Sequence, residues 1–328
     1  MKMKKVKWGI IGCGDVTEIK SGPAFNRVRD SELVAVMRRD TAKAKDYAER
    51  HLVPKWYDNA ENLINDSDVN AIYIATPPSS HCAYTHLAAK AGKPVYVEKP
   101  MAANYYECLS MIDICEKHKV PLFVAYYRRV LPLFLKVKEL VEKGSIGKIL
   151  QTNIKLHLVP NSADYNKENL PWRLKPEIAG AGYFYDLASH QFDYLDFLCG
   201  SIEEVSGNAS NLGGLYKVED NVTASWKFSS GILGTGSWNF VSTKKNVCDE
   251  IEIIGDKGKI IFPTFIRDPI KLITVKGNVE IISEWPKHIQ EPLIKLVVEE
   301  LLGKGTCPSS GLSGARTNWV LDKILNKI

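Results

Sequence analysis

Residues 6–17 of this chain read VKWGIIGCGDVT, and the order of residue types in this stretch predicts how the first part of the protein folds. An apolar run over Val6–Ile11 ends at Gly12, which permits a tight turn, and a helix is expected to begin after Gly14. Glycine at position 14 also lets backbone N–H groups approach a pyrophosphate at a helix N-terminus. The third position of this fingerprint, usually Gly or Ala, is Thr17, so a purely structural turn is the alternative. The cofactor-binding residues predicted here are Gly12, Gly14, Asp15 and Val16.

Short apolar runs alternate with helical patterns up to about Val124. The predicted strands after the first are Leu33–Met37, Ala71–Ala75, Pro94–Val97 and Leu122–Ala125. The predicted helices between them are Ala42–His51, Ala60–Asn65, His81–Ala91 and Tyr105–His118. The runs are apolar on consecutive residues, as expected where both faces of a parallel sheet are covered. Repeats of this kind predict the α/β class, with a doubly wound parallel sheet.

From about Gln151 the pattern changes to strands in which every second residue is apolar. Val222–Phe228 shows this alternation, and a Ser-Ser-Gly turn then leads into Ile232–Phe240. Glu250–Ile254 and Lys259–Phe262 form a second predicted hairpin around a Gly-Asp-Lys-Gly turn. These features predict a second domain of the α+β class built on an open antiparallel sheet.

Two helices accompany this sheet, one at Gly182–Leu198 and one at the end of the chain, Ser313–Ile328. A chain of 328 residues is too long for one ordinary core, which favours two domains. We expect a dinucleotide-binding domain over residues 1–124 and a substrate-binding domain over residues 125–328.

The composition excludes several classes of protein. Hydrophobic residues make up 45% and charged residues 25%, which is typical of globular proteins. The 43 basic and 38 acidic residues are scattered, so no nucleic-acid partner is expected. Seven cysteines without a C-x-x-C pair or a regular framework favour a reducing, cytoplasmic location. No apolar stretch approaches the length of a membrane span, so no membrane association is expected.

The ends of two predicted strands carry further candidates for the cofactor site. Arg38 and Arg39 stand where an acidic residue would bond the ribose 2′-hydroxyl of NAD, and arginine there favours the 2′-phosphate of NADP. The alternatives are a solvated loop, or a ribose contact from Asp40. The segment Thr76–His81 follows another strand at the edge where such sheets bind ligands. Of this loop we expect Thr76, Pro77 and His81 near the cofactor, although each also fits a structural role.

The tripeptide Glu98-Lys99-Pro100 follows the strand Pro94–Val97 at the same edge. A lysine that is partly desolvated beside a cationic nicotinamide exchanges its proton more readily near neutral pH. Pro100 restrains the backbone, and a cis peptide there would aim the lysine side chain. A solvated surface lysine is the alternative.

Asp186 and His190 lie four residues apart in the predicted helix Gly182–Leu198, a spacing that places both on one helix face. A carboxylate can hold an imidazole in one tautomer and raise its basicity, which suits it to bind or deprotonate a hydroxyl. A surface Asp–His pair is the alternative. Because the histidines lack metal-ligand spacing with Cys or carboxylates, no metal is expected.

In this order and spacing, the motifs resemble the Gfo/Idh/MocA family (glucose–fructose oxidoreductase, inositol dehydrogenase, rhizopine catabolism) over essentially the whole chain. The matching segments are GIIGCG, ATPPSSH, EKP and Asp186-x-x-x-His190 after a glycine-rich turn. The resemblance implies a Rossmann domain and an open antiparallel α+β domain that often associates through its sheet, as a homodimer or homotetramer. It also implies that Lys99, Asp186 and His190 surround the carbon that exchanges hydride with NADP or NAD, with Glu98 and Lys99 also at the cofactor.

The resemblance further implies a substrate pocket. Trp172-Arg173 matches a pair that shapes this pocket in the family, whereas Tyr127 replaces a usual asparagine. The expected substrate-binding residues are Tyr127, Arg128, Tyr165, Trp172, Arg173, Asp186 and His190. Taken together, these pocket candidates are charge-neutral and rich in aromatic residues, which favours a neutral sugar or polyol over an acidic substrate. Lys99 or His190 would carry the hydroxyl proton, and a non-catalytic, cofactor-dependent sugar sensor of the same fold is the alternative function.

Overall fold

The computed structural model describes residues 3–328, which divide into two compact units. The first unit contains the chain up to Val130 together with Pro286–Ala315, and the second contains Leu131–Trp285 and Arg316–Ile328. The sequence predicts a single division between residues 124 and 125. The assignment of Pro286–Ala315 to the first unit differs from that prediction. This segment belongs to the first unit because its helix, α10 (Glu291–Leu301), packs against α2 (Ala24–Arg27).

The first unit is built on a six-stranded sheet with the order β3-β2-β1-β4-β5-β6. Its strands are β1 (Val6–Ile11), β2 (Ser31–Met37), β3 (Lys55–Tyr57), β4 (Ala71–Ile74), β5 (Val95–Val97) and β6 (Leu122–Val124). All neighbouring strands run parallel, so the doubly wound sheet predicted from the sequence is confirmed. The chain continues from β1 to β2 on one side of β1, whereas β4 lies on the other side. The crevice where such sheets bind ligands is therefore expected at the carboxyl ends of β1 and β4.

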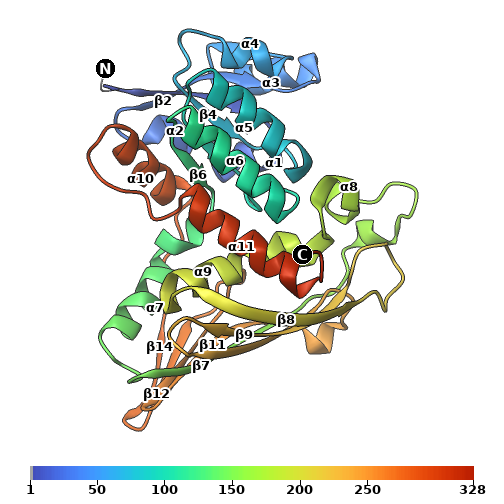
Figure 1. Ribbon diagram of the computed structural model, residues 1–328, viewed down its shortest axis with the longest axis vertical. Helices are drawn as coiled ribbons and strands as arrows, with labels where there is room; N and C mark the ends of the chain where they lie inside the picture. Colours follow the sequence, from blue (N-terminus) through green and yellow to red (C-terminus); the bar gives the residue numbers. More distant parts are fainter. Residues whose placement is uncertain (1–2) are drawn as a thin grey trace. The chain divides into compact units, whose positions relative to one another are not determined.

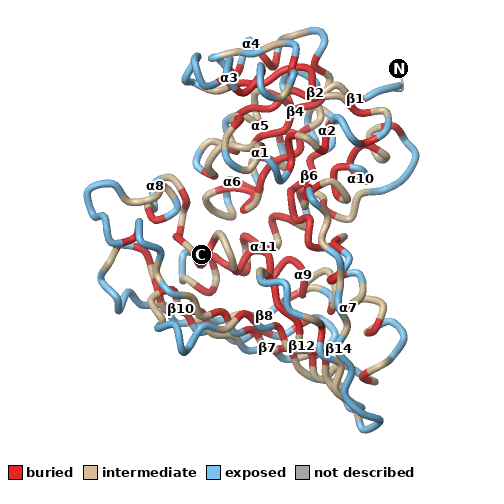
Figure 2. Tube along the Cα trace, turned by 180° about the vertical axis from the view of Figure 1, so that it is seen from behind, coloured by how far each residue is buried: buried red, intermediate tan, exposed pale blue. Residues whose placement is uncertain are grey.

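Helices and helical turns follow most strands of this sheet. They are α1 (Asp15–Ile19), α2, α3 (Thr41–Arg50), α4 (Ala60–Ile64), η1 (Pro78–Ser80), α5 (His81–Lys90), α6 (Tyr105–Lys117) and η2 (Tyr127–Val130). Helices α5 and α6 pack side by side (Figure 1). The strands β1, β2 and β4 are buried along nearly their whole length, which agrees with their continuous apolar sequences (Figure 2).

The second unit is built on an eight-stranded sheet with the order β14-β13-β12-β11-β7-β10-β9-β8. Its strands are β7 (Ile149–His157), β8 (Ile202–Ser210), β9 (Asn221–Phe228), β10 (Leu233–Asn239), β11 (Cys248–Gly255), β12 (Gly258–Phe262), β13 (Ile270–Thr274) and β14 (Gly277–Ile281). The sheet is mostly antiparallel, as expected, but β7 and β10 run parallel. Parallel neighbours need a long crossover connection, and the helical segment and hairpin between β7 and β10 provide it.

The second unit contains two helices of 11 residues, α7 (Pro132–Glu142) and α9 (Ser189–Cys199), and several short helical turns. The short turns are η3 (Ser162–Tyr165), η4 (Trp172–Leu174), α8 (Pro176–Ala179), the π-helical turn η5 (Phe184–Ala188) and η6 (Lys244–Asn246). A last helix, α11 (Gly311–Ile324), begins in the first unit and ends in the second. Phe192 of α9 packs against Trp226 and Trp238, so α9 covers one face of the sheet (Figure 1). On the other face of β9, Thr223, Ser225 and Lys227 are exposed, as the alternating sequence predicts.

Candidate active site

The turn after β1 contains two glycines, Gly12 and Gly14, whose surroundings differ. Gly12 has φ +93°, and a Cβ atom there would lie 2.6 Å from Thr76 Cγ2, in the loop after β4. At Gly14 the backbone is extended, with φ −145°, and a Cβ atom would meet only Gly12 O, at 3.9 Å. Packing within the protein therefore explains Gly12 but not Gly14. The space beside Gly14 is open to a ligand.

Thr17, which departs from the usual fingerprint, closes this turn. Its Oγ1 accepts a hydrogen bond from the Gly14 N–H at 3.0 Å and donates one to Gly14 O at 2.7 Å. The Gly14 N–H is thus used inside the turn. Asp15 and Val16 occupy the first helical positions, where backbone N–H groups have no acceptor within the helix. These two residues remain the candidates for backbone contact with a phosphate.

This difference between the glycines gives a prediction. Gly12→Ala should lower the free energy of unfolding by about 1–3 kcal/mol. Alanine at this position would have to adopt a left-handed backbone conformation, and its Cβ atom would lie too close to Thr76. Gly14→Ala should leave the stability nearly unchanged but weaken dinucleotide binding by about tenfold. Chemical denaturation and a fluorescence titration with the dinucleotide measure the two effects. Wild-type affinity in Gly14→Ala would show that the cofactor does not approach this turn.

Arg38 lies beside the glycine turn. Its Nη1 donates to Cys13 O at 3.2 Å, and the side chain is half-buried, whereas Arg39 is exposed. Asp40 caps helix α3, since its Oδ1 accepts from the Lys43 N–H at 3.1 Å. That hydrogen bond lowers the pKa of the Asp40 carboxyl. Of the three residues, Arg38 is therefore held closest to the turn, and Asp40 is committed to its helix.

The loop after β4 is tied to the loop after β5 by His81. The imidazole is fully buried, with Nε2 at 2.7 Å from Thr76 O and Nδ1 at 3.2 Å from Met101 O. Burial lowers the pKa of His81. The Thr76 hydroxyl oxygen also accepts a hydrogen bond from Ser80 Oγ at 2.7 Å. His81 thus holds the two loops in register, and Pro77 lies in the first of them.

Lys99 stands at the end of β5, next to a buried carboxylate. The Lys99–Pro100 peptide is cis, as considered from the sequence, and the lysine is half-buried. Glu98 is only 6% exposed. Its Oε1 accepts from the Tyr73 hydroxyl at 2.5 Å, and its Oε2 accepts from the Lys99 N–H at 3.2 Å. The residue before Lys99 therefore faces the interior of the first unit and holds the lysine backbone.

In the second unit, Asp186 and His190 lie on two different kinds of helix. Asp186 is in the π-helical turn η5, and His190 is near the start of α9, where it is 2% exposed. One continuous α-helix is expected from the sequence. Because residues 184–188 are π-helical instead, a spacing of four residues does not place Asp186 and His190 as it would in an α-helix. Asp186 Oδ2 accepts from Arg173 Nε at 3.0 Å, a partner that the helical spacing does not predict. The His190 ring lies 6.0 Å from that of Phe265.

Asp186 and Arg173 line the same pocket, which has a volume of about 410 Å³. Its wall is mostly apolar, and Arg173 also lies over the Trp172 ring, 4.4 Å from the ring centroid. The other lining residues are Leu158, Val159, Asn161, Ala163, Pro171, Tyr183, Leu187 and Phe240. The long loop after β7 thus lines a pocket. An apolar pocket with one ion pair is the usual form of a site for a small molecule.

Three residues near this pocket are not predicted by the sequence. Asp164 is fully buried and accepts from the Tyr183 hydroxyl at 2.7 Å, and Asn161 Nδ2 donates to the same hydroxyl at 3.0 Å. Burial and the Asp164 charge raise the pKa of Tyr183. The only local signal is the Asn-x-x-Asp spacing, in which Asp164 accepts from the Asn161 N–H. This network fixes the loop that carries Asn161.

The remaining expected substrate residues differ in exposure. Tyr127 and Arg128 are buried in the first unit, 6% and 4% exposed, and Arg128 lies 5.2 Å from the Tyr127 ring centroid. They follow β6, so they lie at the carboxyl edge of its sheet. Tyr165 is 61% exposed and is not among the residues that line the 410 Å³ pocket.

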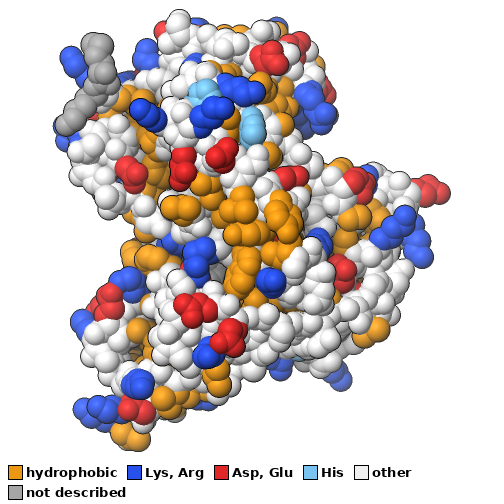
Figure 3. Space-filling view, in the orientation of Figure 1, with side chains coloured by type: hydrophobic (Ala, Val, Ile, Leu, Met, Phe, Trp, Pro, Cys, Tyr) orange, Lys and Arg blue, Asp and Glu red, His pale blue; other side chains and the backbone are white. Residues whose placement is uncertain are grey.

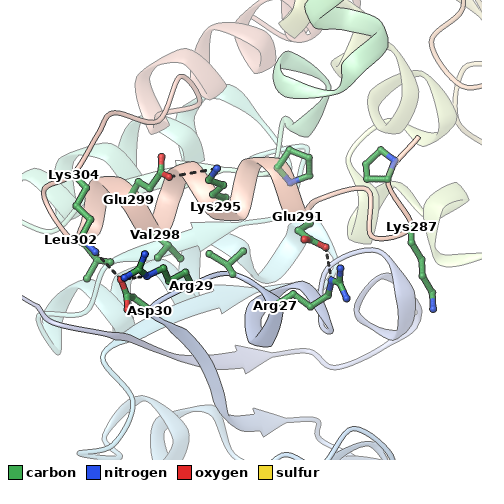
Figure 4. Close-up of a pocket in the computed structure, with 13 residues that line it drawn as sticks. Arg27, Arg29, Asp30, Lys287, Glu291, Lys295, Val298, Glu299, Leu302 and Lys304 are labelled. Carbon is green, nitrogen blue, oxygen red and sulfur yellow. Dashed lines mark hydrogen bonds and ion pairs between the residues drawn. The ribbon is translucent and has the colours of Figure 1, made fainter. Parts of the chain in front are cut away.

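A larger cavity of about 870 Å³ lies in the first unit between α10 and the turn that connects α2 to β2 (Figure 4). That turn precedes β2, so the cavity is at the amino edge of the sheet, away from the glycine turn. Several of its charged side chains pair with one another, among them Arg27 with Glu291 at 2.8 Å and Lys304 with Asp30 at 2.7 Å. These positions and pairings separate the cavity from the candidate active site.

Residues 3–328 contain no cluster of three or more His, Cys, Asp or Glu side chains arranged to hold a metal ion. Over the same range, no helix has the length and apolar character needed to cross a bilayer. Lysine and arginine side chains are interspersed with acidic ones on the face drawn in Figure 3. That face carries no continuous basic stripe of the kind that binds nucleic acid.

Comparisons with known proteins match both units. Residues 6–126 match a family model described as an oxidoreductase family with an NAD-binding Rossmann fold, and residues 134–261 match a GFO/IDH/MocA C-terminal domain. The chain is 39% identical to Oxidoreductase P35 of Formosa agariphila over 321 residues, which cover 97% of this chain and 98% of that protein.

Two further comparisons involve proteins named levoglucosan dehydrogenase. Levoglucosan dehydrogenase of Pseudarthrobacter phenanthrenivorans is 30% identical over 234 residues, which cover 64% of this chain and 60% of that protein. The fold is similar to that of a levoglucosan dehydrogenase solved in complex with NADH, with a TM-score of 0.89 and 23% identity. That similarity covers 98% of this chain and 96% of the solved one.

Proposed function

We propose that this chain, which belongs to the GFO/IDH/MocA family of nicotinamide-dependent oxidoreductases, oxidises or reduces a neutral sugar or polyol. The observation that supports this substrate class is the 410 Å³ pocket of the second unit. Its only charged lining residues, Arg173 and Asp186, pair with each other and so offer no net charge to a ligand. Hydroxyl groups can bond to both members of such a pair, while apolar C–H faces pack on the rest of the wall. Levoglucosan, which names one relative, is a sugar of this neutral type.

The residues proposed to hold the cofactor come from the carboxyl edge of the parallel sheet. They are Gly12, Gly14, Asp15, Val16, Arg38, Arg39, Thr76, Pro77, His81, Glu98 and Lys99. When bound, the nicotinamide ring accepts or donates the hydride. The open space at Gly14 and the N–H groups of Asp15 and Val16 suit a pyrophosphate, while His81 keeps the two flanking loops in register.

NADP is proposed as the preferred cofactor. The Arg38 guanidinium is anchored at Cys13 O, next to the turn where a ribose is expected, and it carries the charge that a 2′-phosphate needs. Asp40, the alternative ribose ligand, already caps α3 and pairs with Lys43 at 3.3 Å.

The proposed catalytic residues are Lys99, Asp186 and His190. Lys99 or His190 moves the proton of the substrate hydroxyl. Asp186, held by Arg173, orients that hydroxyl or the imidazole. The proposed substrate contacts are Tyr127, Arg128, Tyr165, Trp172, Arg173, Asp186 and His190. Trp172 presents an aromatic face suited to the C–H face of a sugar, and its ring is backed by Arg173.

A substrate panel tests this function. Purified protein is incubated with NADP or NAD and with neutral sugars, anhydrosugars and inositols, and absorbance of the reduced cofactor is followed in both directions. Turnover of at least one neutral substrate, with acidic sugars poorer, is expected. Tight cofactor binding without turnover on the whole panel would instead support the non-catalytic sugar sensor.

Self-association through the exposed face of the eight-stranded sheet is also proposed, as a homodimer or homotetramer. The side chains of this face already bond across strands; Thr235 Oγ1, for example, donates to Asn153 Oδ1 at 2.8 Å. Sedimentation equilibrium should give two or four times the 36.7 kDa chain mass. Thr235→Lys should shift the protein toward monomer because it places a charge on the proposed interface, whereas Thr41→Lys, on α3 of the first unit, should not. A monomeric wild-type protein would contradict this assembly.

A cytoplasmic location is proposed from the cysteines. All seven are free thiols, and Cys13, Cys108, Cys115 and Cys199 are buried, as in proteins of reducing compartments. Burial raises the pKa of Cys13 to about 11, which keeps this thiol unreactive. Cell fractionation with an antibody checks the location, and recovery outside the cytoplasm would refute it.

A further inference from the structure

Gln290 enters the first unit from the far end of the chain and reaches the carboxylate beside Lys99. It is fully buried, and its amide uses both ends: Nε2 donates to Glu98 Oε1 at 2.5 Å, and Oε1 accepts from the Tyr96 hydroxyl at 3.0 Å. Neither a glutamate nor a leucine at this position can make both contacts, because the first lacks a donor and the second lacks any polar atom. The residue type is therefore matched to its two partners.

Glu98 receives a hydrogen bond from each of three groups: the Tyr73 hydroxyl, the Gln290 amide and the Lys99 N–H. An acceptor surrounded by donors is the arrangement of an ionised carboxylate. Burial and the Glu98 charge raise the pKa of the Tyr73 hydroxyl well above its usual range, so this hydroxyl stays a donor. The carboxylate is thus fixed on three sides, and one of its contacts is the backbone of Lys99.

The segment that carries Gln290 is itself anchored to the helix after the glycine turn. The Gln290 N–H donates to Lys20 O at 3.1 Å, and His288 Nδ1 lies 2.6 Å from Ile19 O. Glu291, which begins α10, pairs with Arg27 of α2 (Figure 4). Gln290 therefore connects the end of α1 with the end of β5, two elements that carry proposed cofactor-binding and catalytic residues.

We propose that Gln290 is a positioning residue for the proposed oxidoreductase reaction, which it serves by fixing the Glu98 carboxylate and, through it, the backbone of Lys99. This inference rests on the proposed function in that Lys99 is taken as a catalytic residue. Placing a negative charge immediately before Lys99 also balances the positive charge of the ammonium at this strand end. The residue is fully buried and acts through Glu98.

Exchanging the residue types at positions 98 and 290 tests whether the negative charge has to lie at residue 98 when the hydrogen bonds are kept. In the double variant Glu98→Gln, Gln290→Glu, the new amide at 98 can donate to the new carboxylate at 290, which still accepts from Tyr96. Tyr73 can turn its hydroxyl hydrogen to Ser21 Oγ, 3.1 Å away, and accept from the new amide. The buried polar groups therefore remain satisfied, but the negative charge moves from residue 98 to residue 290.

Turnover, thermal unfolding and dinucleotide affinity are measured for Gln290→Leu, Glu98→Gln, Gln290→Glu and the double variant. Gln290→Leu should lower kcat by about tenfold, since small displacements of catalytic groups cost this much or more, while the Kd of the dinucleotide changes by less than about threefold. The double variant should regain most of the Tm lost by the single variants, yet its kcat should stay at least about fivefold below wild type. Recovery of kcat together with Tm would show that the negative charge need not lie at residue 98, and would overturn that part of the proposal.

Ser31→Ala is the matched control, because it removes another buried hydrogen bond of the same unit, from Trp8 Nε1 at 3.1 Å. It should lower Tm without lowering kcat. Equal losses of kcat in Ser31→Ala and Gln290→Leu would mean that general destabilisation explains both, and would overturn the proposal.

Hydrogen exchange at the Lys99 amide gives a readout that does not depend on turnover. Residue 100 is proline, so a peptide that ends there reports on the Lys99 N–H without a following amide. Exchange at this position should be at least about threefold faster in Gln290→Leu, because the acceptor Glu98 loses its anchor. If the wild-type protein turns over no substrate of the panel, the proposed function fails. The exchange rate of the Lys99 amide then tests by itself whether Gln290 positions Lys99. Unchanged exchange would refute the positioning role.

Discussion

Replacing Lys99 with alanine is expected to reduce kcat by about a hundredfold or more while the dinucleotide still binds. The side chain is half-buried at the end of β5, and its backbone is held by the buried Glu98 carboxylate, so truncation removes an ammonium without removing a core group. Steady-state kinetics on the best panel substrate measures kcat, and quenching of protein fluorescence measures cofactor affinity. A loss of kcat with retained binding assigns Lys99 to the chemical step.

Lys117→Ala provides the control, since Lys117 is an exposed lysine of the same unit, on α6. It should behave as wild type. The pH–rate profiles of Lys99→Ala and His190→Gln then identify the proton carrier, because the variant that lacks the carrier loses the limb that reports its ionisation. Turnover near the wild-type rate in Lys99→Ala would remove this lysine from the mechanism.

Replacing Arg38 with aspartate is expected to shift cofactor preference from NADP to NAD by about a hundredfold or more. Loss of a charged hydrogen bond costs about 1.5–3 kcal/mol, and the new carboxylate both repels a 2′-phosphate and can accept from a ribose hydroxyl. The quantity to measure is the ratio of kcat/KM for NADP to that for NAD. The same ratio for the wild-type protein tests the NADP preference itself.

Arg39→Asp is the matched control for this change. Arg39 is exposed, whereas Arg38 is half-buried and donates to Cys13 O, so the same charge reversal at position 39 should shift the ratio much less. An unchanged ratio in Arg38→Asp would exclude Arg38 from cofactor selection. A larger effect at Arg39 would assign the phosphate to that residue instead.

Local pattern was sufficient for most elements of the two sheets. The continuous apolar runs at β1, β2 and β4 are buried as parallel strands, and the alternation in β9 separates its buried and exposed faces. The glycine turn and the EKP tripeptide could also be located, because both stand directly after apolar runs whose ends meet at one sheet edge. The positions of the strands can be predicted from short-range periodicity, because the spacing of apolar residues indicates which faces of an element are buried.

Other features depend on contacts that no local pattern reports. The π-helical turn η5 alters the relation expected of Asp186 and His190. Arg173, which bonds Asp186, lies in η4, 13 positions earlier in the sequence. The parallel pairing of β7 with β10 follows from the path of the chain, not from the sequence of either strand.

The sequence by itself determined the strand–turn–helix order of the first unit, the alternating sheet of the second and the residue types at the ends of β1 and β5. Only the tertiary structure decided that Pro286–Ala315 returns to the first unit and that Gln290 bonds Glu98, 192 residues away. The physical reason is that periodicity encodes burial along one element. A hydrogen bond between buried side chains of distant elements depends instead on where folding brings them together.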